Sequence, residues 1–186
     1  MNKQELRQQL KEKRSKLSKQ EVNNLSSIII NKLTHYINNK ITLDTYFVYN
    51  NFQNEVVTTD FINYLLSNNK KVYLPKINNN LMNAIPYLKD TQMKLNHFKI
   101  YEPIGENINI DNFICITPLL GVDTKGNRIG FGKGYYDQFL KDKTCIKIGI
   151  CYDFQILNNE IETNIHDIPL DIIISEKQII EIKKRN

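Results

Sequence analysis

The chain has no tryptophan, and it contains only three cysteines, seven glycines and five prolines in 186 residues. Cys115, Cys145 and Cys151 form no CxxC pair, so nothing in their spacing indicates a zinc site or a disulfide framework. All three stand in apolar, strand-like runs. This pattern predicts reduced, buried thiols in a cytoplasmic protein.

Long hydrophobic runs are also missing. Runs such as Ile28–Ile30 and Ile172–Ile174 are far shorter than the ~20 residues that a transmembrane helix needs. The first residues, MNKQELRQQLKEKR, lack the apolar segment of a signal peptide, and their acidic residues and glutamines are not typical of a transit peptide. We therefore expect no membrane partner and no targeting segment.

Neither sign of charge dominates, because the chain has 25 basic and 20 acidic residues, a formal charge of +5 and a pI near 9.0. With 41% hydrophobic and 24% charged residues, the composition excludes wholesale disorder. The length predicts a single domain over residues 1–186. The positive charge leaves three interpretations open: a nucleic-acid-binding protein, an enzyme for anionic substrates, or a merely basic surface.

Helical and strand-like segments alternate along the chain. The predicted helices are 3–17, a segment from a capping box of Ser18 and Glu21 to about Tyr36, a segment capped by Thr58 or Thr59, and 135–140. The predicted strands are 41–49, 71–75, 84–88, 113–117, 145–151 and 171–175. This order is typical of a single α/β domain with a mostly parallel central sheet flanked by helices. Asn-rich turns are expected within 78–112, and a frayed basic tail over 183–186.

The first predicted helix separates its side chains by kind, at about 100° per residue. Its leucines form one narrow stripe, made of Leu6, Leu10 and Leu17. Its bases form an adjacent stripe, made of Lys3, Arg7, Lys11 and Arg14, and Glu5 and Glu12 lie on the far side. Two interpretations stay open for this basic stripe: a solvated face beside a core stripe, or an edge that faces an anion.

Five of the seven glycines fall between Gly121 and Gly134, in a run that a strand precedes and a helix follows. In open α/β sheets, ligands bind beyond the carboxyl ends of strands. Alternating glycines at 130, 132 and 134 let backbone N–H groups approach a ligand, and the helix N-terminus, Lys133 and Arg128 add positive charge. The sequence therefore predicts a glycine-rich phosphate loop between strand and helix.

This loop is neither of two common phosphate-binding loops. Asn127 and Gly134 break the Walker A pattern, and Tyr135 replaces the third glycine of GxGxxG. Of Tyr135 and Tyr136, we expect one to be buried against the sheet while the other presents its ring to a heteroaromatic ligand. Asp137 is placed either to bind Mg²⁺ beside phosphates or to cap the next helix.

The run from Asp123 to Asp137 reads Asp-x-x-Gly-Asn-Arg-Ile-Gly-Phe-Gly-Lys-Gly-Tyr-Tyr-Asp. It closely resembles the signature of the 5-formyltetrahydrofolate cyclo-ligase family, also called methenyltetrahydrofolate synthetases. Shorter matches lie in the expected order along nearly the whole chain: Lys3-x-x-Leu-Arg7, Asn54-Glu55, Leu74-Pro75-Lys76, Glu102-Pro103, Gln155 and His166-Asp167-x-x-Leu-Asp171.

The resemblance implies an ATP- and Mg²⁺-dependent enzyme that converts 5-formyltetrahydrofolate into 5,10-methenyltetrahydrofolate and releases ADP and phosphate. ATP would phosphorylate the formyl oxygen, so that N10 can attack and phosphate can leave. The implied catalytic residues are Lys133, Arg128 and Tyr135. The implied ATP site comprises Lys3, Arg7, Arg128, Ile129, Gly130, Phe131, Gly132, Lys133, Gly134, Tyr135 and Tyr136. The implied folate site comprises Asn50, Glu55, Phe98, Phe131, Gly132, Lys133, Gly134 and Tyr135, and the implied Mg²⁺ ligands are Asp137 and Asp167.

Three positions depart from the family's usual pattern. Gln138 follows the signature aspartate, where many relatives have arginine. A tryptophan often precedes the Glu-Pro pair, and Phe98 is the nearest ring here that could cover the folate. Asn50 occupies a position that is often apolar.

Two other function classes compete with this interpretation. A nucleic-acid-binding protein would spread basic and aromatic residues along a groove or sheet face, whereas here they concentrate in one loop. A non-catalytic nucleotide- or folate-binding member of the same fold would not need Lys133, Asp137 and Asp167 together. We therefore expect a cytoplasmic, monomeric enzyme whose partner is the small molecule 5-formyltetrahydrofolate, without a nucleic-acid or membrane partner.

Overall fold

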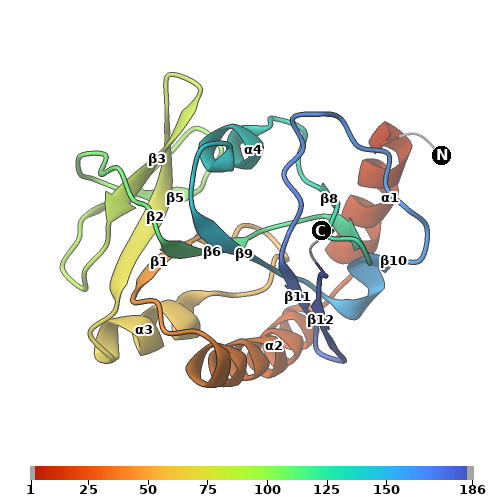
Figure 1. Ribbon diagram of the computed structural model, residues 1–186, viewed down its shortest axis with the longest axis horizontal. Helices are drawn as coiled ribbons and strands as arrows, with labels where there is room; N and C mark the ends of the chain where they lie inside the picture. Colours follow the sequence, from red (N-terminus) through yellow and green to blue (C-terminus); the bar gives the residue numbers. More distant parts are fainter. Residues whose placement is uncertain (1–2, 184–186) are drawn as a thin grey trace.

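A seven-stranded sheet forms the centre of the structure, a computed structural model that describes residues 3–183 (Figure 1). Its strands are Thr45–Val48 (β1), Lys71–Asn78 (β2), Leu81–Pro86 (β3), Phe113–Thr117 (β6), Cys145–Ile150 (β9), Ile172–Ile174 (β11) and Ile179–Glu181 (β12). They are arranged in the order β12-β11-β9-β6-β1-β2-β3. The pairs from β11 to β2 are parallel and the two edge pairs are antiparallel, which confirms the predicted mostly parallel sheet.

Within residues 3–183, four α-helices accompany the sheet: Lys3–Ser15 (α1), Lys19–Lys40 (α2), Thr59–Ser67 (α3) and Tyr135–Leu140 (α4). The predicted capping box starts α2, because Ser18 Oγ accepts from the Glu21 N–H at 3.2 Å and the Glu21 carboxylate accepts from the Ser18 N–H at 2.8 Å. This helix continues to Lys40, four residues beyond the predicted end at Tyr36. In Figure 1, α2 and α3 cover one face of the sheet and α4 covers the other.

The alternation of side chains along β1 explains these layers, since successive residues of a strand point to opposite faces. Tyr46 and Val48 belong to the large core cluster that α2 and α3 share with the sheet. Phe47 points to the other face, where its ring stacks on Phe139 of α4 with centroids 4.6 Å apart. The central strand β6 is buried along its whole length, as a parallel strand covered on both faces must be.

The segment between β2 and β6 is more ordered than its Asn-rich sequence suggests. Asn79 and Asn80 both adopt positive φ (49° and 59°) in the two-residue turn of the β2–β3 hairpin. That hairpin shifts the predicted strand from 84–88 to Leu81–Pro86. Two further strands, Met93–Leu95 (β4) and Tyr101–Pro103 (β5), pair as a separate small sheet.

The glycine-rich run contains structure that the sequence did not indicate. Gly121–Asp123 (β7) and Arg128–Ile129 (β8) pair as a hairpin, and Ile156–Leu157 (β10) completes a three-stranded sheet after a short 3₁₀ helix over Asp153–Gln155. The Asp123 carboxylate shapes the turn by accepting from the N–H groups of Lys125 and Asn127, each at 2.9 Å. The predicted loop is therefore reduced to residues 130–134, between β8 and α4.

Four smaller expectations have different outcomes. Cys115 and Cys151 are buried and free, but Cys145, at the start of β9, is only half-buried. Thr58 occupies the predicted N-cap position of α3, but its side chain makes no capping hydrogen bond, and its hydroxyl instead donates to the Tyr49 carbonyl at 2.8 Å. The predicted frayed tail lies outside the described residues beyond position 183. In residues 3–183, none of the helices combines the length and the apolar composition that spanning a bilayer requires.

Candidate active site

A cleft of about 500 Å³ opens beside the carboxyl ends of β1 and β6. Tyr49 and Asn50, which follow β1, and Pro118, which follows β6, contribute to its wall. Its other walls come from α1, from the β2–β5 region, and from the loop between β8 and α4. The volume is typical of a small-molecule site, and the place agrees with the rule for ligand binding in open α/β sheets.

Nearly all the predicted site residues meet at this cleft. Those that line it are Lys3, Arg7, Asn50, Glu55, Phe98, Arg128, Gly130, Phe131, Gly132, Lys133, Gly134, Tyr135, Tyr136, Asp137 and Asp167. Ile129 does not line it, because its side chain is 1% exposed and packs in a core cluster with Leu10 and Leu120. Ile129 therefore offers no side chain to the cleft, and its place in the ATP site stays a prediction. Ile129 directly precedes the loop, so its buried side chain holds the start of the loop in the core.

The loop at 130–134 owes its shape to glycine at two positions. Gly132 and Gly134 have φ of 91° and 67°, in the left-handed region where a side chain is strained. A Cβ on Gly134 would meet no atom within 4 Å, so backbone conformation and not crowding requires glycine there. Lys133 is exposed between them. The helix that follows has only six residues, so its dipole adds less positive potential than the sequence suggested.

The basic stripe of α1 lies against this loop. Arg7 Nε donates to the Gly130 carbonyl at 3.1 Å, and Lys11 Nζ lies 5.3 Å from the centre of the Phe131 ring. Leu10, on the adjacent stripe, packs α1 onto the small β7–β8–β10 sheet. The alternative of a merely solvated basic face is therefore wrong for this helix.

Two carboxylates mark the end of the cleft nearest the loop. Asp137 Oδ1 lies 3.0 Å from Arg128 Nη2 and accepts from the Ile168 N–H at 3.0 Å. Asp167 Oδ2 lies 2.8 Å from Lys3 Nζ and accepts from the Asn164 N–H at 2.8 Å. Burial alone would raise the pKa of Asp167, but these hydrogen bonds outweigh it and lower the pKa below its ordinary value.

This pair of carboxylates suits one kind of metal ion. Within residues 3–183, no cluster of three or more histidine, cysteine, aspartate or glutamate side chains could form a cage made of protein alone. Mg²⁺ typically takes one or two carboxylates together with phosphate oxygens. Asp137 and Asp167 both reach the cleft, so they fit an ion that binds together with a polyphosphate.

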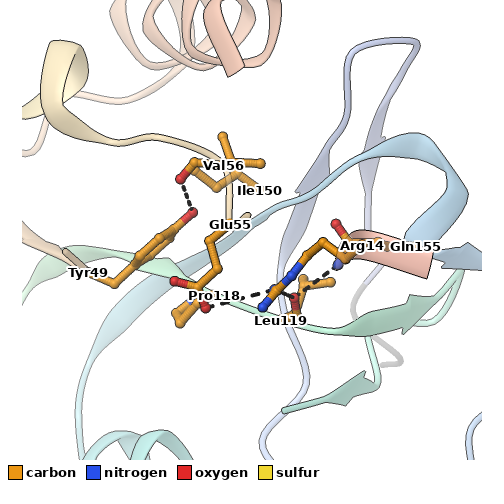
Figure 2. Close-up of a pocket in the computed structure, with 8 residues that line it drawn as sticks. All are labelled: Arg14, Tyr49, Glu55, Val56, Pro118, Leu119, Ile150 and Gln155. Atoms are coloured by element: carbon orange, nitrogen blue, oxygen red, sulfur yellow. Dashed lines mark hydrogen bonds and ion pairs between the residues drawn. The ribbon is translucent and has the colours of Figure 1, made fainter. Parts of the chain in front are cut away.

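Another part of the cleft wall contains a buried carboxylate. Glu55 is 6% exposed, and its Oε2 accepts from the Phe52 N–H at 2.8 Å while Oε1 lies 3.9 Å from Arg14 Nη1 (Figure 2). Burial raises the pKa of Glu55 to about 7, although the Arg14 charge and the Phe52 hydrogen bond both lower it. The carboxylate is thus poised to change its charge near neutral pH.

The two tyrosines after the loop are both half-buried and both line the cleft, so their exposure does not show the predicted division into one buried and one presented ring. Tyr136 packs against Phe47, with ring centroids 6.3 Å apart, and burial raises its pKa well above the ordinary value. Tyr135 is half-buried and lines the cleft. Tyr136 also has the Arg128 guanidinium 5.9 Å from its ring centre, so it contacts a residue that precedes the loop as well as lining the cleft.

The weaker candidates Asn50 and Phe98 both belong to the cleft wall. Asn50 Nδ2 donates to the Tyr101 carbonyl at 3.0 Å, which ties the end of β1 to β5. Phe98 is 44% exposed, with its ring 3.8 Å from that of His97. An exposed ring at the mouth of a cleft can cover a flat ligand.

One functional candidate was missed. Arg14 belongs to the same basic stripe as Lys3 and Arg7, yet sequence reasoning assigned it no site. It is buried, with its guanidinium directed at Glu55 and 5.4 Å from the Phe131 ring centre (Figure 2). Its position on the stripe was the available signal, but no helix pattern shows that Glu55 lies opposite.

Comparison with known proteins finds related sequences and similar solved structures. The sequence profile described as the 5-formyltetrahydrofolate cyclo-ligase family matches residues 1–176. The 5-formyltetrahydrofolate cyclo-ligase of Haemophilus influenzae is 37% identical over 141 residues, covering 68% of this chain and 73% of that protein. The one from Mycoplasma pneumoniae is 32% identical over 182 residues, covering 95% of this chain and all of that protein. The solved structure of Aquifex aeolicus 5,10-methenyltetrahydrofolate synthetase superposes with a TM-score of 0.85 at 30% identity, over all of this chain and 95% of that one.

Proposed function

The chain belongs to the 5-formyltetrahydrofolate cyclo-ligase family, and we propose that it converts 5-formyltetrahydrofolate into 5,10-methenyltetrahydrofolate with ATP as the second substrate. The observation that carries the proposal is the shape of the cleft. One part of its wall, which we call the loop end, is a glycine loop flanked by cations, and another part, which we call the folate end, holds a buried carboxylate. The first end suits a triphosphate, and the second suits the N–H groups of a pterin.

The chemistry explains why a nucleotide and a folate need one shared cleft. A formamide oxygen is a poor leaving group, and N10 attacks an amide carbon only weakly. When the formyl oxygen attacks the γ-phosphorus, the bond to the β-phosphate oxygen breaks and ADP leaves. N10 then attacks the activated carbon and loses its proton, and the C–O bond breaks to release phosphate. The protein must mainly hold the two substrates in line and neutralise charge.

Residues at the loop end neutralise the negative charge of the phosphates. Lys133, exposed beside the cleft, contacts the transferred phosphoryl group, and the N–H groups around Gly132 and Gly134 bind its oxygens. Arg128 contributes less free charge than the sequence suggested, because Asp137 already pairs with it at 3.0 Å. Lys3 and Arg7 reach the cleft from α1 and contact the nucleotide.

Asp137 and Asp167 would hold Mg²⁺ at this end of the cleft. The ion would balance the charge of the phosphates when bound. Both carboxylates now pair with cations, Arg128 and Lys3 respectively, so we expect those cations to turn toward phosphate oxygens as the nucleotide binds.

The folate end orients the reacting formyl group. Glu55 accepts hydrogen bonds from the pterin, Tyr135 lines the pocket, and Phe98 with Phe131 supplies apolar surface for the ring system. In its ionised form, Glu55 is the better acceptor, so we expect folate binding to weaken as the carboxylate is protonated.

The test is the absorbance rise of 5,10-methenyltetrahydrofolate, measured with and without ATP and Mg²⁺. We expect product only with all components present, together with release of ADP and phosphate in equal amounts. Binding of both ligands without any product would identify a non-catalytic member of the fold instead. Product formation independent of ATP would overturn the mechanism.

A further inference from the structure

Arg14, in the last turn of α1, lies behind the folate end of the cleft and does not line it. Its side chain is 4% exposed, and it borders a small niche next to the cleft (Figure 2). Tyr49, Glu55 and Pro118 line both spaces, so they form the partition between them. Arg14 can therefore act on a ligand only through these neighbours or through Phe131, whose ring centre lies 5.4 Å from its guanidinium.

The contacts of Arg14 tie α1 to the segment that carries Glu55. Arg14 Nη1 lies 3.9 Å from Glu55 Oε1 and donates to the Leu119 carbonyl at 3.5 Å. Asn54 Nδ2 donates to the carbonyl of Arg14 at 3.1 Å and to that of Leu17 at 2.9 Å. Two consecutive residues, Asn54 and Glu55, thus hold the same turn of the helix by its main chain and by its side chain.

The charge of Arg14 matters because of what else faces Glu55. Tyr49 after β1, Tyr136 of α4 and Tyr152 after β9 also interact electrostatically with this carboxylate, and none of them is a cation. Glu55 is buried among them, and a buried carboxylate ionises only when a partner offsets the lost hydration. Arg14 is the positive partner in this set.

We propose that Arg14 is a positioning residue that holds the Glu55 carboxylate in place for the pterin without touching the substrate itself. This inference rests on the proposed function for the identity of the ligand. It gives α1 two separate roles in the cleft. The first turns serve the nucleotide through Lys3 and Arg7, and the last turn serves the folate through Glu55.

A double-mutant cycle tests the proposal. The dissociation constant of 5-formyltetrahydrofolate would be measured by calorimetry for Arg14→Met, Glu55→Gln and the double variant, so that the result does not depend on turnover. We expect each single change to weaken binding by about tenfold to a hundredfold, as is common for residues that support a ligand contact. Arg14→Met should add less than about twofold in the Glu55→Gln background, because its effect passes through Glu55.

Two further variants complete the design. Arg14→Lys keeps the charge and should recover most of the affinity. Lys13→Met removes a neighbouring charge from the exposed side of the same turn, where Lys13 contacts Phe154, and should leave folate binding unchanged. The urea midpoint of each variant reports folding, and Arg14→Gln replaces Arg14→Met in the cycle if the latter does not fold.

The pH dependence separates positioning from a purely structural role. Wild-type affinity should fall as the pH drops through the pKa of Glu55, about 7. Without Arg14 the pKa of Glu55 rises, so the loss should begin at a higher pH in Arg14→Gln. Additive effects in the cycle, or an unshifted pH profile, would overturn the role of Arg14. A separate result, a wild-type protein that forms no product, would contradict the proposed function.

Discussion

The loop end and the folate end of the proposed site differ in how they are built. The loop end consists of consecutive residues, 130–134, and its Lys133 is exposed to solvent. The folate end consists of side chains from distant segments, and its charges at Arg14 and Glu55 are buried. Exposed charges are screened by solvent, so they act through their number and place. Buried charges depend on each other, so removing one changes what its partner can do.

The largest expected effect comes from the loop end. Lys133→Ala should lower kcat by about 10²–10³, the size typical of losing one group that stabilises charge in the transition state. Because the lysine is exposed, the urea midpoint should stay at the wild-type value. Lys125→Ala, at an exposed lysine of the preceding hairpin, is the matched control and should retain activity. A folded Lys133→Ala enzyme with full turnover would contradict the assignment.

At the folate end, Glu55 should make the free energy of unfolding depend on pH. The pKa of Glu55 is about 7 in the native state against 4.5 in the unfolded chain, so the native state binds more protons between these values. Its contribution to the free energy of unfolding should therefore fall as the pH rises through this window, by on the order of 3 kcal/mol. Urea unfolding across this window would compare wild type with Glu55→Gln, in which this slope should vanish. Equal slopes in both proteins would show that Glu55 ionises normally.

The proposed metal site lies at the loop end, and a change there should alter the dependence on Mg²⁺ alone. Asp137→Asn should raise the Mg²⁺ concentration for half-maximal activity by about tenfold, since one of two carboxylate ligands is lost. Asp142→Asn, at an exposed position shortly after α4, is the control. An unchanged Mg²⁺ titration would remove Asp137 from the metal site and leave it as the partner of Arg128.

The smallest expected effect concerns the first turns of α1. Lys3→Ala with Arg7→Ala should raise the KM for ATP roughly threefold to tenfold, because each contributes a partly exposed charge near the nucleotide. The KM for 5-formyltetrahydrofolate should change less. Steady-state kinetics with each substrate varied in turn would measure both values. Equal changes in the KM for ATP and in the KM for 5-formyltetrahydrofolate would contradict the division of the cleft into a nucleotide part and a folate part.

The sequence alone determined the features that depend on residues close together in the chain. Apolar runs indicated the buried strands, Ser18 with Glu21 indicated the start of α2, and alternating glycines indicated the loop at 130–134. These signals need only neighbours along the chain, because periodicity and turn chemistry act over a few residues. The loop end of the cleft was predictable for the same reason.

Only the tertiary structure decided which distant residues meet. It paired Asp137 with Arg128, placed Arg14 against Glu55, and buried Ile129 within the β7–β8 hairpin, which no local pattern indicated. Whether a carboxylate is solvated or enclosed depends on segments far away in the chain, and that enclosure is what raises the pKa of Glu55. Burial is a property of the folded whole, so sequence reasoning could name the members of this site without predicting their charge.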